Sequence, residues 1–418
     1  RGLGDVYKRQ ITNHGTYAMA GTGTRSSKSQ LRLDGPVTFA GNGTLEVRTE
    51  HENFLTPLNG AGDILAIGPD HTFDILPGAR CYMEGIGFTN AGTVRSSGLF
   101  QLSVPTVTNS GLIAIPAGGN MQAGLYGPLA LDNTTGEIAI APDGIPQFLN
   151  GEVIGGRVTG GGIFRCGSSA AVSGGIEFED TAIVLGGFNV LDVSDTLTTN
   201  SLIRLAAGSS SRFCRLRCDG RAVLDGTGTL AAVNANQNYL SRANNAPDDE
   251  FVLTESFRLE VQDGGWLYSD APVTVHGNLV VNGRAFFVAP QPALTTAPST
   301  RISGTGTLQV TAPFENQGTI APGNSTGALA FTLQVTHAPT ATLEFEIGGT
   351  TQGVDYDYLG TGGQSLDGTL NVIHVNGFMP GVGDTFDLIG GPLSGSFHTV
   401  HLPLLAPGLD WDAGDLET

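Results

Sequence analysis

Lysine is nearly absent from this chain, and cations of any kind are scarce. Only Lys8 and Lys28 occur among the 418 residues, and 20 basic against 39 acidic residues give a net charge of −19. Phosphate binding needs clustered cations, so this balance argues against a nucleic-acid partner and against docking on anionic lipid. A phosphate loop, whose motif ends in Gly-Lys, is excluded from the chain beyond Lys28.

Cysteine is equally scarce, and its four positions are scattered. Four cysteines are too few for a disulfide scaffold in a chain of this length. Cys214 and Cys218 would lie roughly 13 Å apart on one extended strand, at ~3.3 Å per residue, and a disulfide spans at most ~7 Å between Cα atoms. We therefore expect buried free thiols, as for Cys81 and Cys166; pairing of Cys214 with Cys218 would require a turn between them.

Long apolar runs are missing as well. None approaches the ~20 residues of a transmembrane helix, so the sequence predicts no membrane-spanning segment. Helices are disfavoured, because glycine occurs 62 times, about twice the ~7% of average usage, and each interior glycine costs a helix roughly 1 kcal/mol. Short apolar runs separated by glycine-rich turns are instead typical of an all-β protein.

Two short patterns recur along the chain. In the first, an apolar residue, Asn, Gly and a second apolar residue occupy every other position. Its copies are Ile11–Tyr17, Phe88–Val94, Val107–Ile113 and Phe314–Ile320, with one extra residue in Leu131–Ile138. The second pattern, Gly-x-Gly-Thr-Leu, occurs at Gly41–Leu45, Gly226–Leu230 and Gly304–Leu308. Asn90 and Asn109 are 19 residues apart and Asn109 and Asn133 are 24 apart, so the repeat is near 20 residues.

This period, with short strands and no helical segment, predicts a right-handed parallel β-helix in which each coil buries its apolar face on its neighbours. Asn and Gly both tolerate the left-handed conformation, so we expect them to turn the chain between strands. Stacked Asn side chains are also expected to form hydrogen-bonded ladders along the axis. The alternative, an antiparallel sandwich with Asn-Gly hairpins, does not explain the recurring period.

The sequence divides into three segments. Residues 1–10 (RGLGDVYKRQ) resemble a sequencing artefact and are left out of the fold. Residues 11–312 are predicted to form the β-helix repeats. Residues 313–418 are predicted to form a C-terminal β capping module, truncated at its end, which covers the open edge of the last coil.

Strands can be predicted inside the capping module. Leu343, Phe345 and Ile347 alternate with glutamates, which is typical of a strand with one wet face. Further strands are predicted at 370–375 and 385–389, between glycine-rich turns.

The C-terminal segment resembles a known class of surface proteins. The stretches that carry the likeness are Ala321–Leu329 (APGNSTGAL), Leu343–Leu359 (LEFEIGGTTQGVDYDYL), Gly368–Leu388 (GTLNVIHVNGFMPGVGDTFDL) and Gly395–Trp411 (GSFHTVHLPLLAPGLDW). They resemble the C-terminal passenger region of bacterial autotransporter-like and PEP-CTERM-type surface proteins, while the N-terminal coils are similar only in style. The resemblance implies a secreted or cell-surface solenoid closed by this region, and it implies no catalytic residues.

Several motifs suggest chemistry, and each has a simpler interpretation. Gly323–Gly327 matches the G-x-S-x-G nucleophile elbow, but the strand-like stretch after it favours a turn over the helix that an elbow needs. His398 and His401 would point to opposite faces of a strand, which disfavours a shared metal. The run from His51 lacks the second His of H-E-x-x-H.

Two groups of carboxylates are further candidates. Asp355 and Asp357 would share one face of a strand, where they could hold Ca²⁺ or act as an acid/base pair. Asp248–Glu250 lie in a polar stretch, residues 234–250, that is typical of a loop. Neither group has the spacing of a calcium loop, so we interpret both as solvated carboxylates and predict no metal or cofactor.

Arg212, Arg215, Arg217 and Arg221 form the one dense cationic patch in the sequence. On a strand Arg215 and Arg217 share a face, so this patch is the candidate binding site for an anionic glycan. The alternative is that each arginine pairs with a carboxylate of a neighbouring coil on the outside of the solenoid.

Together these features predict a secreted or cell-surface structural or adhesive β-solenoid of a bacterium, without catalytic activity. The predicted partner is an extracellular glycan or another cell surface. The alternative is a glycan-active β-helix enzyme, a polysaccharide lyase or hydrolase, since parallel β-helices often carry such chemistry. Pectin hydrolases of this fold share Gly-His-Gly and Arg-Ile-Lys motifs. This sequence lacks both motifs, and its Asp248-Asp249 pair stands alone.

Overall fold

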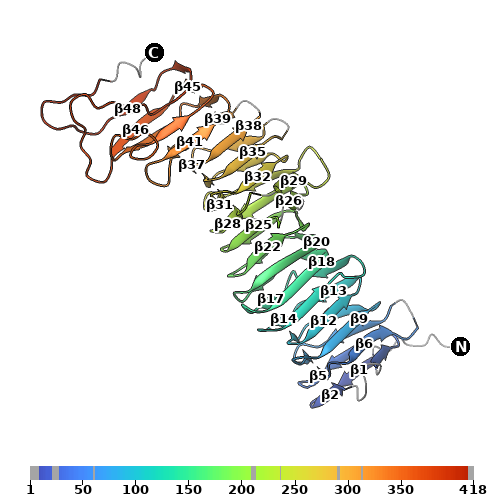
Figure 1. The fold of residues 1–418 in the computed structure, drawn as a ribbon. Helices are drawn as coiled ribbons and strands as arrows, with labels where there is room; N and C mark the ends of the chain where they lie inside the picture. The colour runs from blue at the N-terminus through green and yellow to red at the C-terminus, as the bar shows by residue number, and fades with distance from the viewer. Residues whose placement is uncertain are drawn as a thin grey trace. The chain divides into compact units, whose positions relative to one another are not determined.

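The computed structural model describes residues 9–20, 28–59, 62–208, 213–235, 237–289, 292–311 and 314–412. These residues form strands and turns, with no helix among them. They divide into two compact units, residues 1–202 and residues 203–418. Within each unit the strands pair in parallel, which makes the fold an all-β parallel β-helix and rules out the antiparallel sandwich (Figure 1).

Each turn of the chain in unit 1, here called a coil, has three strands, which we assign in chain order to faces 1, 2 and 3. Face 1 contains β1 (Arg9–Thr12), β4 (Val37–Ala40), β7 (Ile64–Ile67), β10 (Gly87–Asn90), β13 (Thr106–Asn109), β16 (Leu129–Asp132) and β23 (Val190–Val193). Face 2 contains β2 (Thr16–Met19), β5 (Thr44–Val47), β8 (Thr72–Ile75), β11 (Thr93–Ser96), β14 (Leu112–Ile115), β17 (Glu137–Ile140), β19 (Arg157–Thr159), β21 (Ile176–Phe178) and β24 (Thr196–Thr199). Face 3 contains β3 (Ser29–Leu33), β6 (Glu52–Pro57), β9 (Arg80–Glu84), β12 (Leu99–Ser103), β15 (Asn120–Ala123) and β22 (Ala182–Gly186). The long strands β18 (Ile145–Ile154) and β20 (Ile163–Ser173) run from face 3 into face 1 of the next coil.

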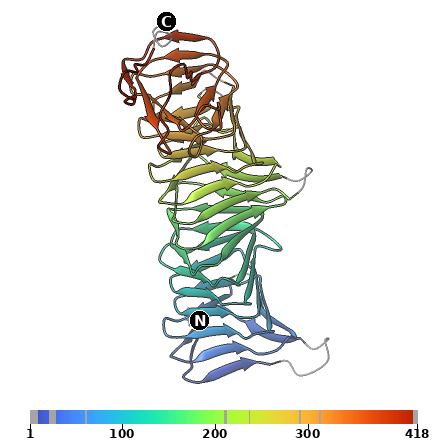
Figure 2. The same cartoon turned by 60° about the vertical axis from the view of Figure 1, so that its left-hand side comes forward.

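Unit 2 repeats the same order of three faces. Face 1 contains β26 (Phe213–Cys218), β29 (Gln237–Arg242), β32 (Trp266–Ser269), β35 (Arg284–Phe287), β38 (Thr307–Val310), β41 (Ala328–Phe331) and β44 (Tyr358–Gly360). Face 2 contains β27 (Arg221–Asp225), β30 (Glu250–Leu253), β33 (Val273–Val275), β36 (Leu294–Thr296), β39 (Phe314–Asn316), β42 (Val335–His337), β45 (Gln364–Leu366) and β47 (Leu393–Gly395). Face 3 contains β25 (Leu202–Ala206), β28 (Thr229–Ala232), β31 (Arg258–Val261), β34 (Asn278–Val281), β37 (Arg301–Gly304), β40 (Thr319–Pro322), β43 (Thr342–Ile347), β46 (Thr369–His374) and β48 (Thr399–His401). In Figure 2 the strands of each unit lie one above another as rungs.

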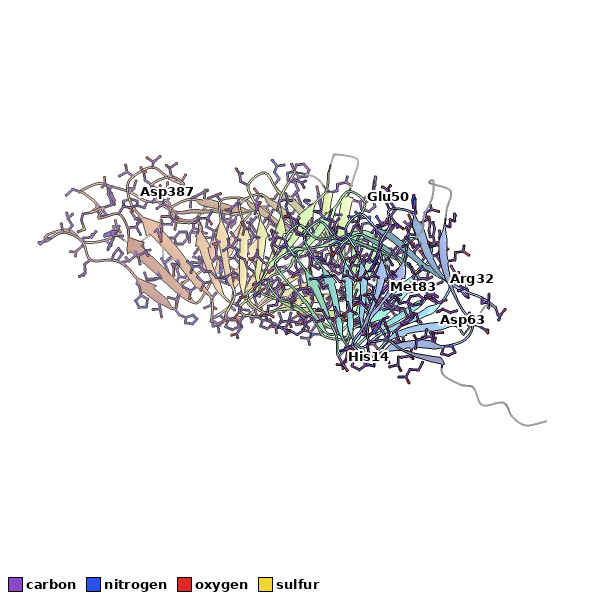
Figure 3. The ribbon with its side chains drawn as sticks, turned by 90° about the horizontal axis from the view of Figure 1, so that it is seen from below. His14, Arg32, Glu50, Asp63, Met83 and Asp387 are labelled. Carbon is purple, nitrogen blue, oxygen red and sulfur yellow. The ribbon has the colours of Figure 1, made fainter. Side chains whose placement is uncertain are left out.

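Side chains alternate between the inside of the coil and the solvent, as the period of a strand requires. Phe73 in β8 is 0% exposed and packs edge-on against Phe100 of β12, with ring centroids 5.5 Å apart. In Figure 3 Met83, which is fully buried, lies among the strands of the first coils, whereas the exposed His14 and Arg32 lie at the rim. Each coil therefore shares one continuous apolar interior with its neighbours in the same unit.

The predicted asparagine ladder is confirmed in unit 1. Asn90 Nδ2 donates to Asn109 Oδ1 at 2.7 Å, and Asn109 Nδ2 donates to Asn133 Oδ1 at 2.7 Å. The three side chains are at most 1% exposed. They lie at the corner where face 1 turns into face 2, so the ladder supplies hydrogen bonds where the strands stop.

The physical role predicted for the repeat's Asn and Gly was wrong. None of Asn90, Asn109, Gly92 and Gly111 has a positive φ angle. The glycines are needed for space instead: a Cβ atom on Gly92 would lie 2.2 Å from the carbonyl oxygen of Gly68 in the preceding coil. The left-handed conformation occurs in the second pattern, for example at Gly304, whose φ is 114°.

The last two residues of the segment 1–10, which was predicted to be an artefact, belong to the fold. Arg9 and Gln10 belong to β1, which pairs with β4, so residues 9 and 10 are part of the first coil. Residues 1–8 lie outside the described ranges.

The C-terminal segment continues the solenoid. On face 3, β40 pairs with β37 and β43 pairs with β40, so parallel stacking passes through the predicted boundary at residue 313. On face 2 a separate four-stranded sheet begins at β39, close to that boundary. The strands predicted around Phe345 and at 370–375 are confirmed as β43 and β46. The strand predicted at 385–389 is wrong, because only Ile389 makes an isolated bridge there.

A second polar ladder lies inside unit 2. Asn316 Nδ2 is 3.4 Å from His337 Nδ1, and His337 Nε2 is 2.7 Å from Gln364 Oε1; all three side chains are at most 3% exposed. The Asn316 amide is fixed, since its Oδ1 accepts from the backbone N–H of Gly318. His337 therefore accepts at Nδ1 and donates at Nε2. Burial lowers the pKa of His337 because it removes water from the charged form; the hydrogen bond to Gln364 and the charge of Asp367 oppose this shift.

Asn109→Ala tests the first ladder. It leaves the Asn133 oxygen without a donor and removes an acceptor from Asn90, so we expect unit 1 to lose about 2 kcal/mol or more of unfolding free energy. Urea unfolding followed by circular dichroism measures this loss. Asn120→Ala is the control, because the buried Asn120 Oδ1 has no hydrogen-bond partner. An equal loss in both variants would contradict a stabilising role for the ladder.

The second ladder predicts a pH dependence. Because the folded pKa of His337 lies below its unfolded value near 6.5, the unfolded state binds more protons between these two values. The stability contributed by His337 is therefore present above pH ~6.5 and lost as the pH falls through the folded pKa. We expect wild type to lose stability relative to His337→Asn between about pH 7.5 and about pH 5, as measured by urea unfolding. A difference that stays constant across this range would refute the assignment.

Candidate functional site

The structure divides the predicted arginine patch. Arg215 and Arg217 point outward from β26 on face 1, as predicted. Arg221 lies on face 2 in β27, where its Nε is 2.9 Å from Glu250 Oε1, so it is an ion-paired surface residue and does not join the others. Arg212 lies outside the described residues. The anionic-glycan site therefore cannot be built from the four arginines as a group.

A different set of side chains surrounds Arg215. In-register pairing places Arg215, Tyr239, Tyr268 and Phe286 side by side on β26, β29, β32 and β35. The centroids of Tyr239 and Tyr268 are 5.6 Å apart, and those of Tyr268 and Phe286 are 4.6 Å apart. The guanidinium of Arg215 lies over the ring of Tyr239, 5.3 Å from its centroid. One row of the sheet exterior thus consists of a cation followed by three aromatic rings (β26, β29, β32 and β35 in Figure 1).

A second row runs beside the first. Phe213, Gln237, Trp266 and Arg284 occupy the outward positions two residues earlier on the same strands. The Arg284 guanidinium lies over Trp266 at 5.5 Å, and that of Arg215 lies over Phe213 at 4.4 Å. We call Arg215, Tyr239, Tyr268, Phe286, Trp266 and Arg284 the arginine–aromatic strip.

The strip carries cations on strands that have no acid of their own. Strands β26, β29, β32, β35 and β38 contain no Asp or Glu, in a chain of net charge −19. The nearest acids in sequence, Asp219 and Asp270, follow β26 and β32. On the other faces arginines meet carboxylates, as in the Arg258–Glu260 pair at 3.0 Å on β31. Among the described residues, Arg215 and Arg284 have no such carboxylate partner.

The orientation of the rings decides which ligands can approach them. Tyr268 and Phe286 are nearly parallel, with an interplanar angle of 9°. Each ring covers the face of the next, so half-buried rings that project from the sheet present their edges to solvent. Ring edges carry the positive part of the aromatic quadrupole and ring faces the negative part.

The sequence held no direct signal for this strip. Tyr239, Tyr268 and Phe286 are separated by 29 and 18 residues, so no fixed spacing connects them. Turns of different length between the strands absorb the difference, and only the strand register aligns the three rings. The outward alternation of each strand could have been predicted, but the pairing of one strand with the next could not.

A polar hollow on face 3 of unit 2 is the second candidate. Arg301 Nη2 reaches from β37 across β40 to Glu344 Oε1 on β43, at 2.6 Å. The small outward residue of β40, Ala321, leaves a hollow of about 210 Å³ beneath this ion pair. Ser325 Oγ donates to Glu346 Oε2 at 3.2 Å at the other side. The turn Gly323–Gly327 leads directly into β41, so it is not a nucleophile elbow, as predicted.

Asp357 lies against the hollow and is 1% exposed. Its Oδ1 accepts the backbone N–H of Gly327 at 2.8 Å, and its Oδ2 accepts that of Glu346 at 2.7 Å. Burial raises the pKa of Asp357 to about 7; the two N–H donors oppose this shift, and the charges of Glu346 and Glu344 add to it. Both oxygens are occupied by the backbone, so Asp357 holds the chain that follows β43 in place.

The predicted pairing of Asp355 with Asp357 on one strand face was wrong. Asp355 lies in a turn, where its Oδ2 accepts from the backbone N–H of Thr351 at 3.2 Å. Asp357 follows that turn and is buried, so its interpretation as a solvated carboxylate was also wrong. The chain reverses between β43 and β44 here, so the alternation of a strand does not apply.

The interpretation of Asp248–Glu250 as solvated carboxylates was wrong for Asp249, which has a structural role. The stretch 234–250 was predicted as a loop, but it contains β29 and the first residue of β30. Asp249 is 1% exposed and accepts the backbone N–H of Gly220 at 2.8 Å and that of Ala246 at 2.9 Å. It fastens a turn to the preceding coil and has no access to a substrate.

The remaining predicted residues have structural roles. The four cysteines are free and buried, as predicted, and burial raises the pKa of Cys214 to about 12. His398 pairs with Asp367 at 2.5 Å, in the turn before β48, which holds His401. Within the described residues no group of three or more His, Cys, Asp or Glu side chains is arranged to hold a metal ion.

Comparison with known proteins gives no family for this chain. No protein-family model matches it, and no curated protein matches it.

The raised pKa of Asp357 makes the stability of unit 2 depend on pH. Its folded pKa of about 7 lies above its usual value of 3.8, so the folded state binds more protons between these values. Its contribution to stability is thus largest below pH ~4 and is lost as the pH rises through about 7. Asp357→Asn also removes one of two acceptors, which costs about 1–3 kcal/mol.

Urea unfolding across pH measures both effects. We expect wild type to exceed Asp357→Asn in stability by more at about pH 4.5 than at about pH 7.5. Asp355→Asn, at a solvent-exposed hydrogen bond, is the control and should change stability by less than about 1 kcal/mol. A stability gap that widens with rising pH would show that Asp357 is not a buried carboxyl of raised pKa.

Proposed function

We propose that this chain is a secreted or cell-surface structural or adhesive β-solenoid of a bacterium that holds an extracellular glycan without cleaving it. The in-register stacking of coils is the observation that carries this proposal. It turns single outward residues into straight rows with a spacing of about 4.8 Å, as in the row Thr319, Thr342 and Thr369 on β40, β43 and β46. Such rows suit a ligand that is itself a repeating polymer.

The charge distribution supports the same conclusion. The net charge of −19 disfavours nucleic acid and anionic lipid as partners.

Within the described residues no helix is long and apolar enough to cross a membrane. The secreted or surface location rests on the resemblance of the C-terminal stretches to passenger regions of surface proteins.

A glycan-active enzyme is the second candidate, and the polar hollow is the observation that favours it. Glu344, Glu346 and Arg301 gather there from neighbouring coils. Hydrolysis of a glycosidic bond needs one free carboxylic acid and one free carboxylate. Glu344 is held by Arg301 and Asp357 by two backbone N–H groups, which leaves only Glu346, whose Oε2 accepts from Ser325. The hollow therefore supports catalysis less well than the rows support binding.

A panel of acidic and neutral polysaccharides separates the two functions. We expect the purified chain to co-sediment with at least one polysaccharide and to produce no new reducing ends and no unsaturated uronates. Cleavage that Glu346→Gln abolishes would establish an enzyme and overturn the proposal. Cleavage that persists in Glu346→Gln would point to a contaminating activity, which a mock purification identifies.

A further inference from the structure

The ring geometry of the arginine–aromatic strip restricts its ligand. Sugars and nucleic-acid bases bind aromatic side chains through the ring face. Here the faces of Tyr268 and Phe286 cover each other, and Arg215 covers the outer side of Tyr239. A ligand that needs a free ring face therefore finds Tyr239 and Tyr268 covered on both sides.

What the row offers is positive potential. The exposed ring edges are the positive part of each quadrupole, and Arg215 and Arg284 add full charges without carboxylate partners in the described part of the chain. A guanidinium that stacks on a ring keeps its N–H groups in its own plane, parallel to the ring, and these groups can bind an anion in pairs. The absence of Asp and Glu from the five strands leaves these charges uncompensated on their own face.

Extent along the solenoid is the third observation. The strip passes through β26, β29, β32 and β35, four successive strands of face 1. At about 4.8 Å between strands it covers roughly 14 Å between the outer two, which exceeds the size of one small anion. An extended polymer with anionic groups along its length matches this arrangement.

We propose that the arginine–aromatic strip is the binding site for an extended acidic polysaccharide, whose carboxylate or sulfate groups contact Arg215, Arg284 and the edges of the stacked rings. This inference rests on the proposed adhesive function and gives it a site and a ligand class. The site keeps only Arg215 from the predicted patch, and Arg284 and the aromatic rings are added to it.

A charge-matched pair of double variants tests the site. Arg215→Gln with Arg284→Gln removes two charges from the strip, whereas Arg221→Gln with Arg258→Gln removes two ion-paired charges from the other faces of the same unit. Binding of the full chain is measured by affinity electrophoresis in gels containing polygalacturonate, dextran sulfate or neutral dextran. Thermal unfolding of each variant establishes that it is folded.

We expect wild type to bind polygalacturonate or dextran sulfate but not dextran, and to bind less as salt rises. The strip variant should bind about tenfold more weakly or worse, the loss that one charge-assisted hydrogen bond carries, and the control variant should bind like wild type. The polygalacturonate and dextran sulfate gels distinguish carboxylate from sulfate recognition. Arg215→Lys with Arg284→Lys keeps the charge but loses the planar fork of the guanidinium. The affinity of this variant should therefore fall between those of wild type and of the strip variant.

The outcomes separate failure of the site from failure of the function. Equal binding by the strip variant, or an equal loss in the control variant, would overturn the site and leave the adhesive function standing. No binding by wild type to any polysaccharide would overturn both. Tighter binding of single-stranded oligothymidylate than of either acidic polysaccharide would overturn the ligand class, since it would require free ring faces.

Discussion

The whole structure depends on parallel, in-register stacking of one coil on the next. A single coil of about 20 residues has no interior of its own, because its inward side chains meet those of the coils above and below. Backbone hydrogen bonds, the apolar core and the polar ladders all run between coils within a unit. Removing the register would remove all three at once, which explains why glycine occurs where it does: a Cβ atom on Gly92 would push two coils apart.

Polar groups inside such a core need partners that repeat with the coils. The asparagine row in unit 1 meets this need with identical side chains: Asn90 donates to Asn109, and Asn109 donates to Asn133. Unit 2 meets it with Asn316, His337 and Gln364, which lie on the strands of face 2. The exchange of an amide for an imidazole keeps the hydrogen bonds but introduces a group that titrates, and so couples the stability of those coils to pH.

Much of the fold was predictable from the sequence, and much of the candidate site was not. The spacing of Asn90 and Asn109 indicated the period, the parallel architecture and the buried ladder. Residues that are one period apart in the sequence lie next to each other when the coils stack. The alternation around Phe345 gave β43. The strip could not be found in this way, since Tyr268 and Phe286 meet through strand pairing, and the length of the intervening turn hides this pairing. Arg221 was misassigned for a related reason: a turn moves it to another face, six residues from Arg215.

The asparagine ladder has a consequence for how such a chain can change its length. Every amide in the row points the same way along the axis, so each rung fits only a neighbour in the same phase. Loss of one residue within a strand would move its outward residues inward and break the row. Duplication of a complete coil would preserve phase, direction and partners together. The solenoid can therefore lengthen or shorten along its axis only by whole coils, whereas residues added within a turn leave its length unchanged.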